Sequence, residues 1–376
     1  MTAFRSLAAL LSVFLCTLTG CSTLTPTTAL PDGFTVKSVA QLDQNAPFAV
    51  NRNGEFAAVH QGALVLTGPS GASRQLAQER ATALSFSPSG AKLAAAFPTG
   101  KQTILRLFDC KGGAVLTDTT LPDRITSIAW RSENEVLATT LGIQKFSFGS
   151  LLSSRVYRWD AATPPVATTL GDVTVRPALA RMPEERIFDT LHLAVSPYGD
   201  EIAYSAIKDP PLFPPYQRVT IRHLETDAER EVAQIGIGSG GPIYAPDGES
   251  LVIGDAGRMT LRISIPEAKE IDAWPTPGSF PALSPSGAYL FLDGTLYQES
   301  RALTSFPVQS KAAFLPDGSG LALSYDGKLY LVSGLKDQAA PALPADLGQL
   351  LKLRRLRSLG LISEQEYRKQ RPGVRP

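Results

Sequence analysis

The sequence predicts an all-β fold, a seven-bladed β-propeller followed by a short C-terminal α-helical hairpin. Three observations predict it. A hairpin pattern recurs seven times, a further strand candidate follows each copy, and a leucine-rich helical pattern replaces these short runs near Pro344. Repetition of one supersecondary unit is the sequence signature of a repeat architecture. We therefore place the propeller at residues 33–344 and the helical tail at residues 345–376.

The N-terminal segment has the three-part build of a secretory signal peptide. Arg5 supplies a positive charge, residues 7–18 are mostly apolar, and small residues precede Cys21. The apolar stretch is about a dozen residues, whereas a helix needs ~20 to span a bilayer. We therefore expect this segment to be removed rather than to remain as a transmembrane helix. If Cys21 has no part in this removal, the segment is an ordinary cleaved signal peptide and the cysteine is incidental.

The residues before Cys21, Leu18-Thr19-Gly20, resemble the lipobox of bacterial lipoproteins. The resemblance implies that residues 1–20 are lost and that Cys21 carries acyl chains such as palmitate. Several chains on one cysteine would exceed the marginal membrane binding of a single chain. Ser22, where an Asp would imply the inner membrane, implies the outer membrane facing the periplasm. Residues 21–32 are then a tether, because their polar, proline-bearing composition suits a linker.

Charge is balanced overall but uneven along the chain. The formal net charge is +1, and it falls to zero when Arg5 is lost, so no general affinity for nucleic acid is expected. The tail carries eight basic and three acidic residues, a formal +5, which leaves about −5 on the preceding body. Of the three cysteines, only Cys110 would remain free, so we expect no internal disulfide and a buried, apolar role for Cys110.

Each of the seven hairpins has two short apolar runs joined by a polar turn that usually ends in Gly. Gly supplies the positive φ that such turns need. The copies begin at Phe48, Leu84, Ile128, Leu193, Ile243, Ala282 and Ala312. The strand candidates that follow them are GALVLTG, TILRLFD, RVYRWDA, RVTIRHL, RMTLRIS, GTLYQES and GKLYLVS. With the variable run before the next hairpin, each unit has four strands, as in a propeller blade.

The turns SPSG, SPYG and APDG and the strands LRLFD and VYRWD resemble those of TolB-like and WD-repeat-like propellers. This resemblance covers roughly residues 33–340 and implies architecture alone. Blade three departs from it, since Glu133 and Asn134 stand where a Gly is expected. Residues 33–40 are expected to close the ring as the outer strand of the last blade, which would remove an exposed edge.

Three insertions are expected on one face of the ring. If strands a, b, c and d run outward from the axis, the ab and cd turns share one face and the bc and da connections share the other. Residues 142–154 fall between strands b and c of blade three, 174–190 between blades three and four, and 207–218 between b and c of blade four. Loops lengthened on one side of a rigid scaffold are where binding surfaces usually form.

The three insertions are rich in aromatic and basic residues, and aromatics and Arg are enriched at binding hot spots. The prolines of DPPLFPPY stiffen the third insertion, which lowers the cost of holding Phe213 and Tyr216 outward. The loop patch predicted to bind a periplasmic protein partner consists of Phe146, Phe148, Arg186, Phe188, Phe213, Tyr216 and Arg218. The alternative is that these aromatics fold back as lids over the blades.

The tail has the signals of two helices. Asp346 is expected to cap the first, which should end near Gly360 in the left-handed conformation. Ser363 and Glu366 have the spacing of a capping box that starts the second. Leucines recur every three residues from Leu347 to Leu359, fewer than the 3.6 of a helical turn, so they wind around the helix.

The spaced leucines, the Gly-Leu-Ile-Ser turn and the Glu-Tyr pair resemble the SHOCT motif, a helical hairpin at the C-terminal end of many bacterial proteins. The resemblance implies homo-oligomerisation or docking to a partner. The residues expected to dock are Leu350, Leu353, Leu356 and Tyr367. A basic tail could instead pack on the acidic propeller body or lie on an anionic membrane.

Catalytic and cofactor motifs are absent from the sequence. It contains no G-x-S-x-G elbow, no H-E-x-x-H, no P-loop and no cysteine cluster for metal. His60, His192 and His223 fall in different blades, with His192 near the expected central channel. Asp200, Asp247 and Asp317 recur in or beside ab turns, where Asp is favoured for local hydrogen bonding.

The favoured interpretation is a lipid-anchored periplasmic propeller that acts as a protein-interaction scaffold in the cell envelope. It is not expected to be an enzyme or to need a cofactor or metal. The alternative is a hydrolase or lyase that acts on a glycan or peptide in the central channel, with a metal held by carboxylates and carbonyl groups.

Overall fold

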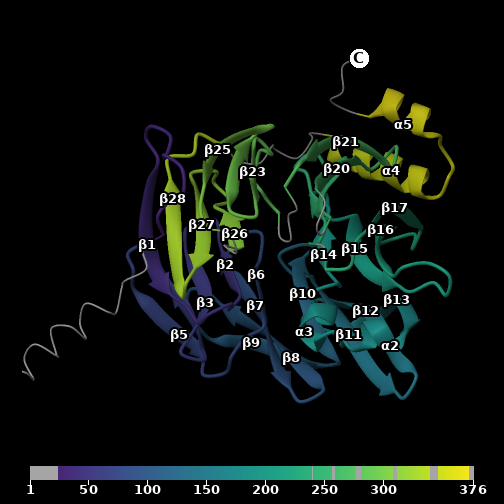
Figure 1. Ribbon diagram of the computed structural model, residues 1–376, viewed down its shortest axis with the longest axis horizontal. Coiled ribbons are helices and arrows are strands. Elements are labelled where there is room, and N and C mark those ends of the chain that lie inside the picture. The colour runs from purple at the N-terminus through teal and green to yellow at the C-terminus, as the bar shows by residue number, and fades with distance from the viewer. Residues whose placement is uncertain are drawn as a thin grey trace, which may run out of the picture.

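The computed structural model describes residues 24–238, 240–255, 259–276, 281–307, 311–338 and 346–371. Seven four-stranded antiparallel sheets form the blades of a ring (Figure 1). The predicted seven-bladed propeller is confirmed, as is the short pair of C-terminal helices. No helix in these ranges is long and apolar enough to cross a membrane.

Blades one to six each use four consecutive strands, ordered from the axis outward. Blades one and two contain β2 (Phe48–Val50), β3 (Phe56–His60), β4 (Ala63–Thr67) and β5 (Ser73–Ala77), then β6 (Ala83–Phe86), β7 (Lys92–Thr99), β8 (Gln102–Asp109) and β9 (Val115–Pro122). Blades three and four contain β10 (Arg124–Trp130), β11 (Val136–Phe146), β12 (Gly149–Trp159) and β13 (Val166–Val175), then β14 (Leu193–Val195), β15 (Glu201–Lys208), β16 (Tyr216–His223) and β17 (Glu229–Ile235). Blades five and six contain β18 (Ile243–Tyr244), β19 (Ser250–Gly254), β20 (Thr260–Ser264) and β21 (Lys269–Trp274), then β22 (Ala282–Leu283), β23 (Tyr289–Leu292), β24 (Thr295–Gln298) and β25 (Arg301–Ser305).

Blade seven closes the ring with strands from both ends of the propeller. Its inner strands are β26 (Lys311–Phe314), β27 (Gly320–Tyr325) and β28 (Lys328–Ser333), and its outer strand is β1 (Thr35–Gln41). Strand β1 runs antiparallel to β28, from Thr35 opposite Ser333 to Gln41 opposite Lys328. The predicted closure is therefore confirmed, and it covers the edge that β28 would otherwise expose.

The core lies between neighbouring blades. In β7 all residues from Leu93 to Phe97 are buried, because a b strand lies inside its blade and has another blade against each face. The outer strand β9 is largely exposed and alternates instead. This difference explains why the b strands read as continuous apolar runs, whereas the outer strands form the more variable part of each repeat.

The ab turn of blade three forms without a glycine in its loop. Glu133 of this turn accepts hydrogen bonds from the backbone and hydroxyl of Ser89, in the ab turn of blade two. Lys92 Nζ donates to the Glu133 carbonyl oxygen at 3.0 Å and to Asn134 Oδ1 at 3.1 Å. The departure from the repeat pattern thus supplies a link between adjacent blades.

The two faces of the ring carry different additions. On the bc/da face, α2 (Pro177–Ala180) and α3 (Glu184–Phe188) connect blades three and four. On the ab/cd face, α4 (Leu347–Ser358) and α5 (Glu364–Gln370) lie over blades four and five (Figure 1). The propeller therefore presents two candidate surfaces on opposite sides.

Residues 24–30 lie against the outer edge of blade six. The Thr27 backbone N–H donates to the Ser305 carbonyl oxygen at 2.7 Å, and the Ser305 N–H donates to Thr28 Oγ1 at 2.8 Å. Leu24 is buried in an apolar cluster with residues of blades six and seven. Much of the segment predicted to be a tether is therefore docked on the propeller. Cys21 and the predicted signal peptide lie outside the described residues.

Candidate functional site

The three insertions lie side by side on the bc/da face of blades three and four. The first is not a loop, because residues 142–154 prolong β11 and β12 into one long hairpin with residues 147–148 at its tip. Gly149 lies so close to the end of β13 that a Cβ there would be 2.3 Å from the Val175 carbonyl oxygen. The next residue, Arg176, contacts the third insertion. The prediction of a common face is confirmed.

Arg176 braces the proline-rich loop of residues 209–215. Its backbone N–H donates to Asp209 Oδ2 at 2.6 Å, and its Nε donates to Asp209 Oδ1 at 2.8 Å. Its Nη2 also donates to the carbonyl oxygen of Phe213 at 2.9 Å. The Asp209 side chain is fully buried in this pairing. Sequence reasoning missed Arg176 because its role depends on contacts with a loop 33 positions away.

The crest of this surface is exposed and apolar. Phe148 is 68% exposed, Phe213 66% and Phe146 40%. The rings of Phe146 and Phe148 stack at 5.4 Å between centroids. Leu212, which was not predicted, is 89% exposed beside Phe213. We call Phe146, Phe148, Leu212 and Phe213 the tip residues; they do not fold back as lids.

The other members of the loop patch lie at its base or flank. Phe188 is half-buried between blades three and four, with the Arg124 guanidinium 4.3 Å from its ring centroid. Tyr216 and Arg218 are half-buried in β16, and Arg186 is exposed on α3. The predicted set therefore divides into outward aromatics and residues that support them.

The C-terminal helices form the second surface by packing on the ab/cd face of blades four and five. Leu350, Leu353 and Tyr367 are buried there, with Tyr198 of the blade-four turn packed against them. Leu356 is half-buried, and the leucines do wind around α4 as predicted. Of the three alternatives for the tail, the structure shows packing on the propeller body. Self-association and docking to a partner stay predictions.

Arg354 is the centre of this contact. Its side chain is fully buried, and its guanidinium donates to Asp200 and Glu201 of blade four and to Glu249 of blade five. The distance from Nη1 to Glu249 Oε1 is 3.1 Å, and the Tyr367 hydroxyl donates to the same oxygen at 2.9 Å. We call Arg354 and the three carboxylates the arginine pocket.

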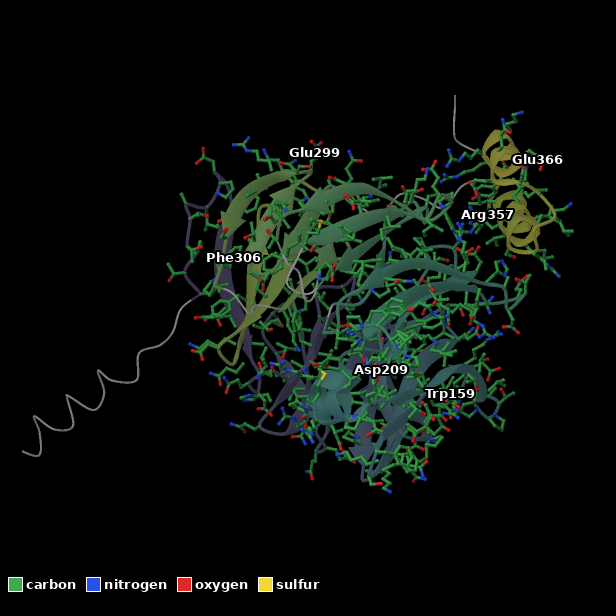
Figure 2. The ribbon with its side chains drawn as sticks, turned by 45° about the vertical axis from the view of Figure 1, so that its right-hand side comes forward. Trp159, Asp209, Glu299, Phe306, Arg357 and Glu366 are labelled. Carbon is green, nitrogen blue, oxygen red and sulfur yellow. The ribbon has the colours of Figure 1, made fainter. Side chains whose placement is uncertain are left out.

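A second arginine, Arg357, contacts two of the same carboxylates at longer distances. Arg357 lies 3.6 Å from both Glu201 and Glu249, and its guanidinium is 4.2 Å from the Tyr367 ring centroid. Figure 2 shows Arg357 on the side of α4 next to the propeller. At the rim, Arg355 pairs with Glu225 at 3.6 Å. Ion pairs between the basic tail and the acidic body therefore accompany the apolar contacts that hold the tail.

Burial and charge act in opposite directions on the carboxylates of the arginine pocket. Burial raises the pKa of Asp200, but the charge and hydrogen bond of Arg354 and the hydrogen bond from Ser196 outweigh it, so the pKa is lowered. Burial raises the pKa of Glu201, and the charges of Asp200 and Glu249 reinforce this against Arg354. Those same carboxylates hold the pKa of Arg354 well above its usual value, against the effect of burial. Arg354 therefore stays charged.

The helix ends follow two of the three predicted signals. Gly360 takes the left-handed conformation at φ +68°, and Ser363 and Glu366 form a complete capping box. The prediction that Asp346 caps α4 is wrong, because its side chain makes no capping hydrogen bond. Its φ of −96° and ψ of 41° are not the extended conformation that a capping residue adopts.

The sequence signals identified only part of the arginine pocket. Asp200 was assigned to turn chemistry, and it does accept a hydrogen bond from Ser196 Oγ at 2.6 Å. Glu201, Glu249 and Arg354 were not singled out. The contrast between a basic tail and an acidic body was the available signal, but it does not say which charges meet.

The histidines do not form a cluster. His223 is buried and His192 is half-buried, and burial lowers the pKa of each, whereas His60 lies at the end of β3. Across the described ranges, no group of three His, Cys, Asp or Glu side chains is placed to hold a metal ion. The enzyme alternative stays a prediction.

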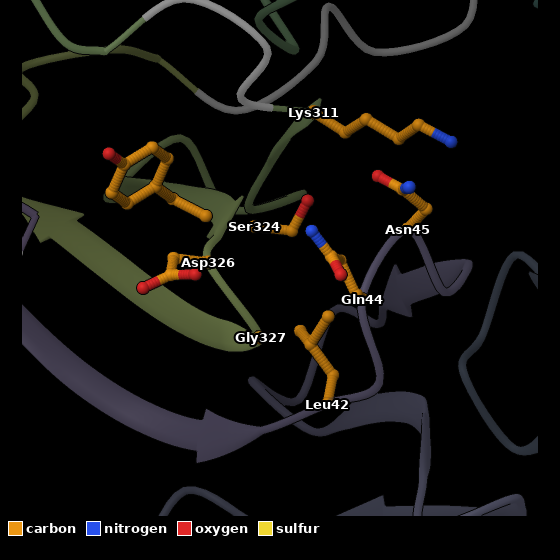
Figure 3. Close-up of a pocket in the computed structure, with 8 residues that line it drawn as sticks. Leu42, Gln44, Asn45, Lys311, Ser324, Asp326 and Gly327 are labelled. Atoms are coloured by element: carbon orange, nitrogen blue, oxygen red, sulfur yellow. The ribbon is translucent and has the colours of Figure 1, made fainter. Parts of the chain in front are cut away.

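A small polar cavity of about 160 Å³ opens beside blade seven. The β1–β2 connection faces the bc turn and inner strand of this blade across it (Figure 3). Its lining includes Leu42, Gln44, Asn45, Lys311, Ser324 and Asp326. The lining of this cavity includes no residue of the loop patch or of the arginine pocket, and its side chains do not indicate a reaction.

No protein-family model and no curated protein matches this chain. Solved structures share its fold. A chain in the crystal structure of the mitotic checkpoint complex has a TM-score of 0.55 at 12% identity, with 84% of this chain and 96% of that chain covered. A chain of Kuenenia stuttgartiensis hydrazine synthase has a TM-score of 0.56 at 11% identity, with 84% and 100% covered.

The β-propeller domain of Myceliophteria thermophila Cps50 (Swd1) is similar as well. It has a TM-score of 0.53 at 17% identity, and the match covers 83% of this chain and 99% of that chain. At these identities the likeness concerns the fold alone. It agrees with the propeller architecture of the seven sheets.

Proposed function

We propose that this protein is a lipid-anchored scaffold of the bacterial cell envelope, whose propeller binds a protein partner through the tip residues. The acyl chains on Cys21 would hold it to the outer membrane, facing the periplasm. Its SHOCT-like tail would contribute to assembly through protein–protein contacts and would take no part in a reaction. The activity proposed is binding, without catalysis.

The observation that carries this proposal is the exposed apolar crest of the loop patch. Four large apolar side chains on a β-hairpin and a proline-rich loop stay exposed, although each would gain from burial. Arg176 and the four prolines hold the loop in place, which lowers the entropy lost on binding. A rigid apolar crest suits a protein interface with aromatic anchors.

The test replaces Phe148 and Phe213 with Ala in the full-length chain. A photo-activated cross-linker at Leu212 should link to a specific envelope protein in cells, and the double variant should lose most of that product with little change in melting temperature. The matched control replaces Val115 and Leu116 with Ala, because both are half-exposed on the outer strand of blade two. Equal cross-linking in the double variant and the control would count against the patch.

Anchoring is tested separately. The wild-type chain should incorporate labelled palmitate and sediment with membranes, and Cys21→Ser should abolish both. The hydrolase or lyase alternative predicts something else, a stoichiometric and tightly held metal in the purified protein. Metal analysis of the protein isolated without chelators distinguishes that alternative from a scaffold.

A further inference from the structure

The segment from Leu24 to Leu30 is bound along the outer edge of blade six. Thr27 donates both its N–H and its hydroxyl to the Ser305 carbonyl oxygen, at 2.7 and 3.1 Å. Thr28 Oγ1 accepts from the Ser305 N–H and lies 3.2 Å from Thr304 Oγ1. These contacts satisfy backbone groups at the edge of β25, which would otherwise face solvent. The segment therefore binds this edge through Thr27 and Thr28 without adding a strand to the sheet.

Apolar contacts hold the two ends of the same segment. Leu24 is 5% exposed and belongs to an apolar cluster that includes Phe306 and Phe314, and Leu30 packs on this cluster. The cluster lies at the seam between blades six and seven. The segment is consequently held at both ends and in the middle, unlike a free linker.

This docking shortens the connection to the membrane. A free linker of twelve residues, 21–32, would have a root-mean-square length of about 20 Å and an extended length of about 40 Å. With Leu24 docked, only Ser22 and Thr23 lie between Cys21 and the folded propeller, and the three steps from Cys21 to Leu24 span at most about 10 Å. A lipid on Cys21 would therefore be attached close to one particular edge of the ring.

That edge is remote from the loop patch. The seam between blades six and seven lies three blades away from the seam between blades three and four, nearly half of the seven-bladed ring. Figure 1 shows β25 and β28 on the left and α2 and α3 at the lower right. An anchor at the first seam leaves the second on the far side.

We propose that the docking of residues 24–30 holds the propeller close to its lipid anchor, so that the outer edge of blades six and seven faces the bilayer. The inference rests on the lipid anchor proposed above. The propeller is then held edge-on to the membrane surface, and the tip residues lie in the part of the ring farthest from the lipid, where a partner can reach them.

The test measures which positions lie near lipid. The lipidated, full-length chain is reconstituted in phosphatidylethanolamine and phosphatidylglycerol vesicles that contain a nitroxide-labelled lipid. A fluorophore is attached to a cysteine in place of Gln41 on blade seven, Phe148 at the patch, or Leu361 between α4 and α5, all exposed positions. Burial raises the pKa of Cys110 to about 12, so this thiol should not be labelled.

Quenching at Gln41→Cys is expected to exceed that at Phe148→Cys and Leu361→Cys several-fold. Replacing Leu24 with Ser should reduce this difference, whereas the matched change Ala29→Ser, at an exposed position of the same segment, should preserve it. Comparable quenching at Phe148→Cys would overturn the proposal in favour of the bc/da face lying on the lipid. Weak quenching at all three positions of vesicle-bound protein would overturn it in favour of a free tether. Failure of the wild-type chain to take up palmitate is a different result, because it rejects the anchor itself.

Discussion

Replacing Arg354 with Met should release the C-terminal helices from an otherwise intact propeller. Met keeps most of the side-chain volume but removes the charge that pairs with Asp200, Glu201 and Glu249. These carboxylates are buried, so they would repel one another without a central cation. Removing one partner of a buried ion pair costs about 3–5 kcal/mol. Arg357 would remain, but its ion pairs are longer, at 3.6 Å.

Whether the tail is released depends on how this lost ion pairing compares with the apolar contribution of α4. Leu350 and Leu353 are the buried aliphatic residues of α4, and burial of two leucines contributes about 3–6 kcal/mol before the cost of ordering the tail. A loss of 3–5 kcal/mol is therefore comparable with the whole apolar contribution of α4. The ratio of docked to released tail should fall roughly 10²- to 10³-fold, since each 1.4 kcal/mol is about tenfold in an equilibrium constant.

The assay is hydrogen exchange followed by mass spectrometry, with the melting temperature of the propeller measured in parallel. Amides of α4 and α5 should lose protection in Arg354→Met, while those of b strands such as β7 keep theirs. Arg355→Met is the matched control, because Arg355 is the next residue but forms an exposed ion pair with Glu225. Such pairs contribute about 0–1 kcal/mol. Equal loss of protection in the two variants would refute the reasoning.

Two further predictions concern pH and the loop patch. The pKa of Asp200 is lowered in the folded protein, so its stabilising effect is present above the ordinary value of 3.8 and is lost as the pH falls through the lowered value. The pKa of Glu201 is raised above its ordinary value of 4.5. In the pH range between 4.5 and the raised pKa, the docked state binds this proton more readily, so lowering the pH through that range favours docking. A fluorophore at Leu361→Cys should therefore report a docked tail from pH 7 to pH 5 and release only below about pH 4, and release between pH 7 and 5 would contradict this. Arg176→Ala should increase protease cleavage beside Phe213 at least several-fold without lowering the melting temperature by more than a few degrees; unchanged cleavage would show that the prolines alone fix the loop.

Local patterns were sufficient to predict the blades. A polar turn between two apolar runs defines each ab hairpin, and this information lies within about a dozen residues, as from Leu84 to Phe97. Ring closure by β1 was also predictable, because residues 33–40 have a strand pattern before the first hairpin and the last blade lacks a fourth strand. Capping at Ser363 is likewise local.

Other features depended on contacts that the local patterns do not reveal. Residues 142–154 look like a loop insertion, but their pairing across β11 and β12 continues to Phe146 opposite Gly149. Residues 24–32 have the composition of a free linker, yet Thr27 and Ser305, 278 positions apart, are hydrogen-bonded. Sequence composition describes what a segment favours in isolation, and the neighbouring surface changed that preference.

The sequence by itself determined the number of blades, the closure of the ring, the presence of two tail helices and the opposite charges of tail and body. Those features depend on periodicity, turn chemistry and composition, which act over short stretches. Only the tertiary structure decided that Arg354 meets Asp200, 154 positions away, and that the tip residues stay exposed. Ion pairing in a buried site depends on which groups share a small volume, and the packing of whole blades and helices sets that volume.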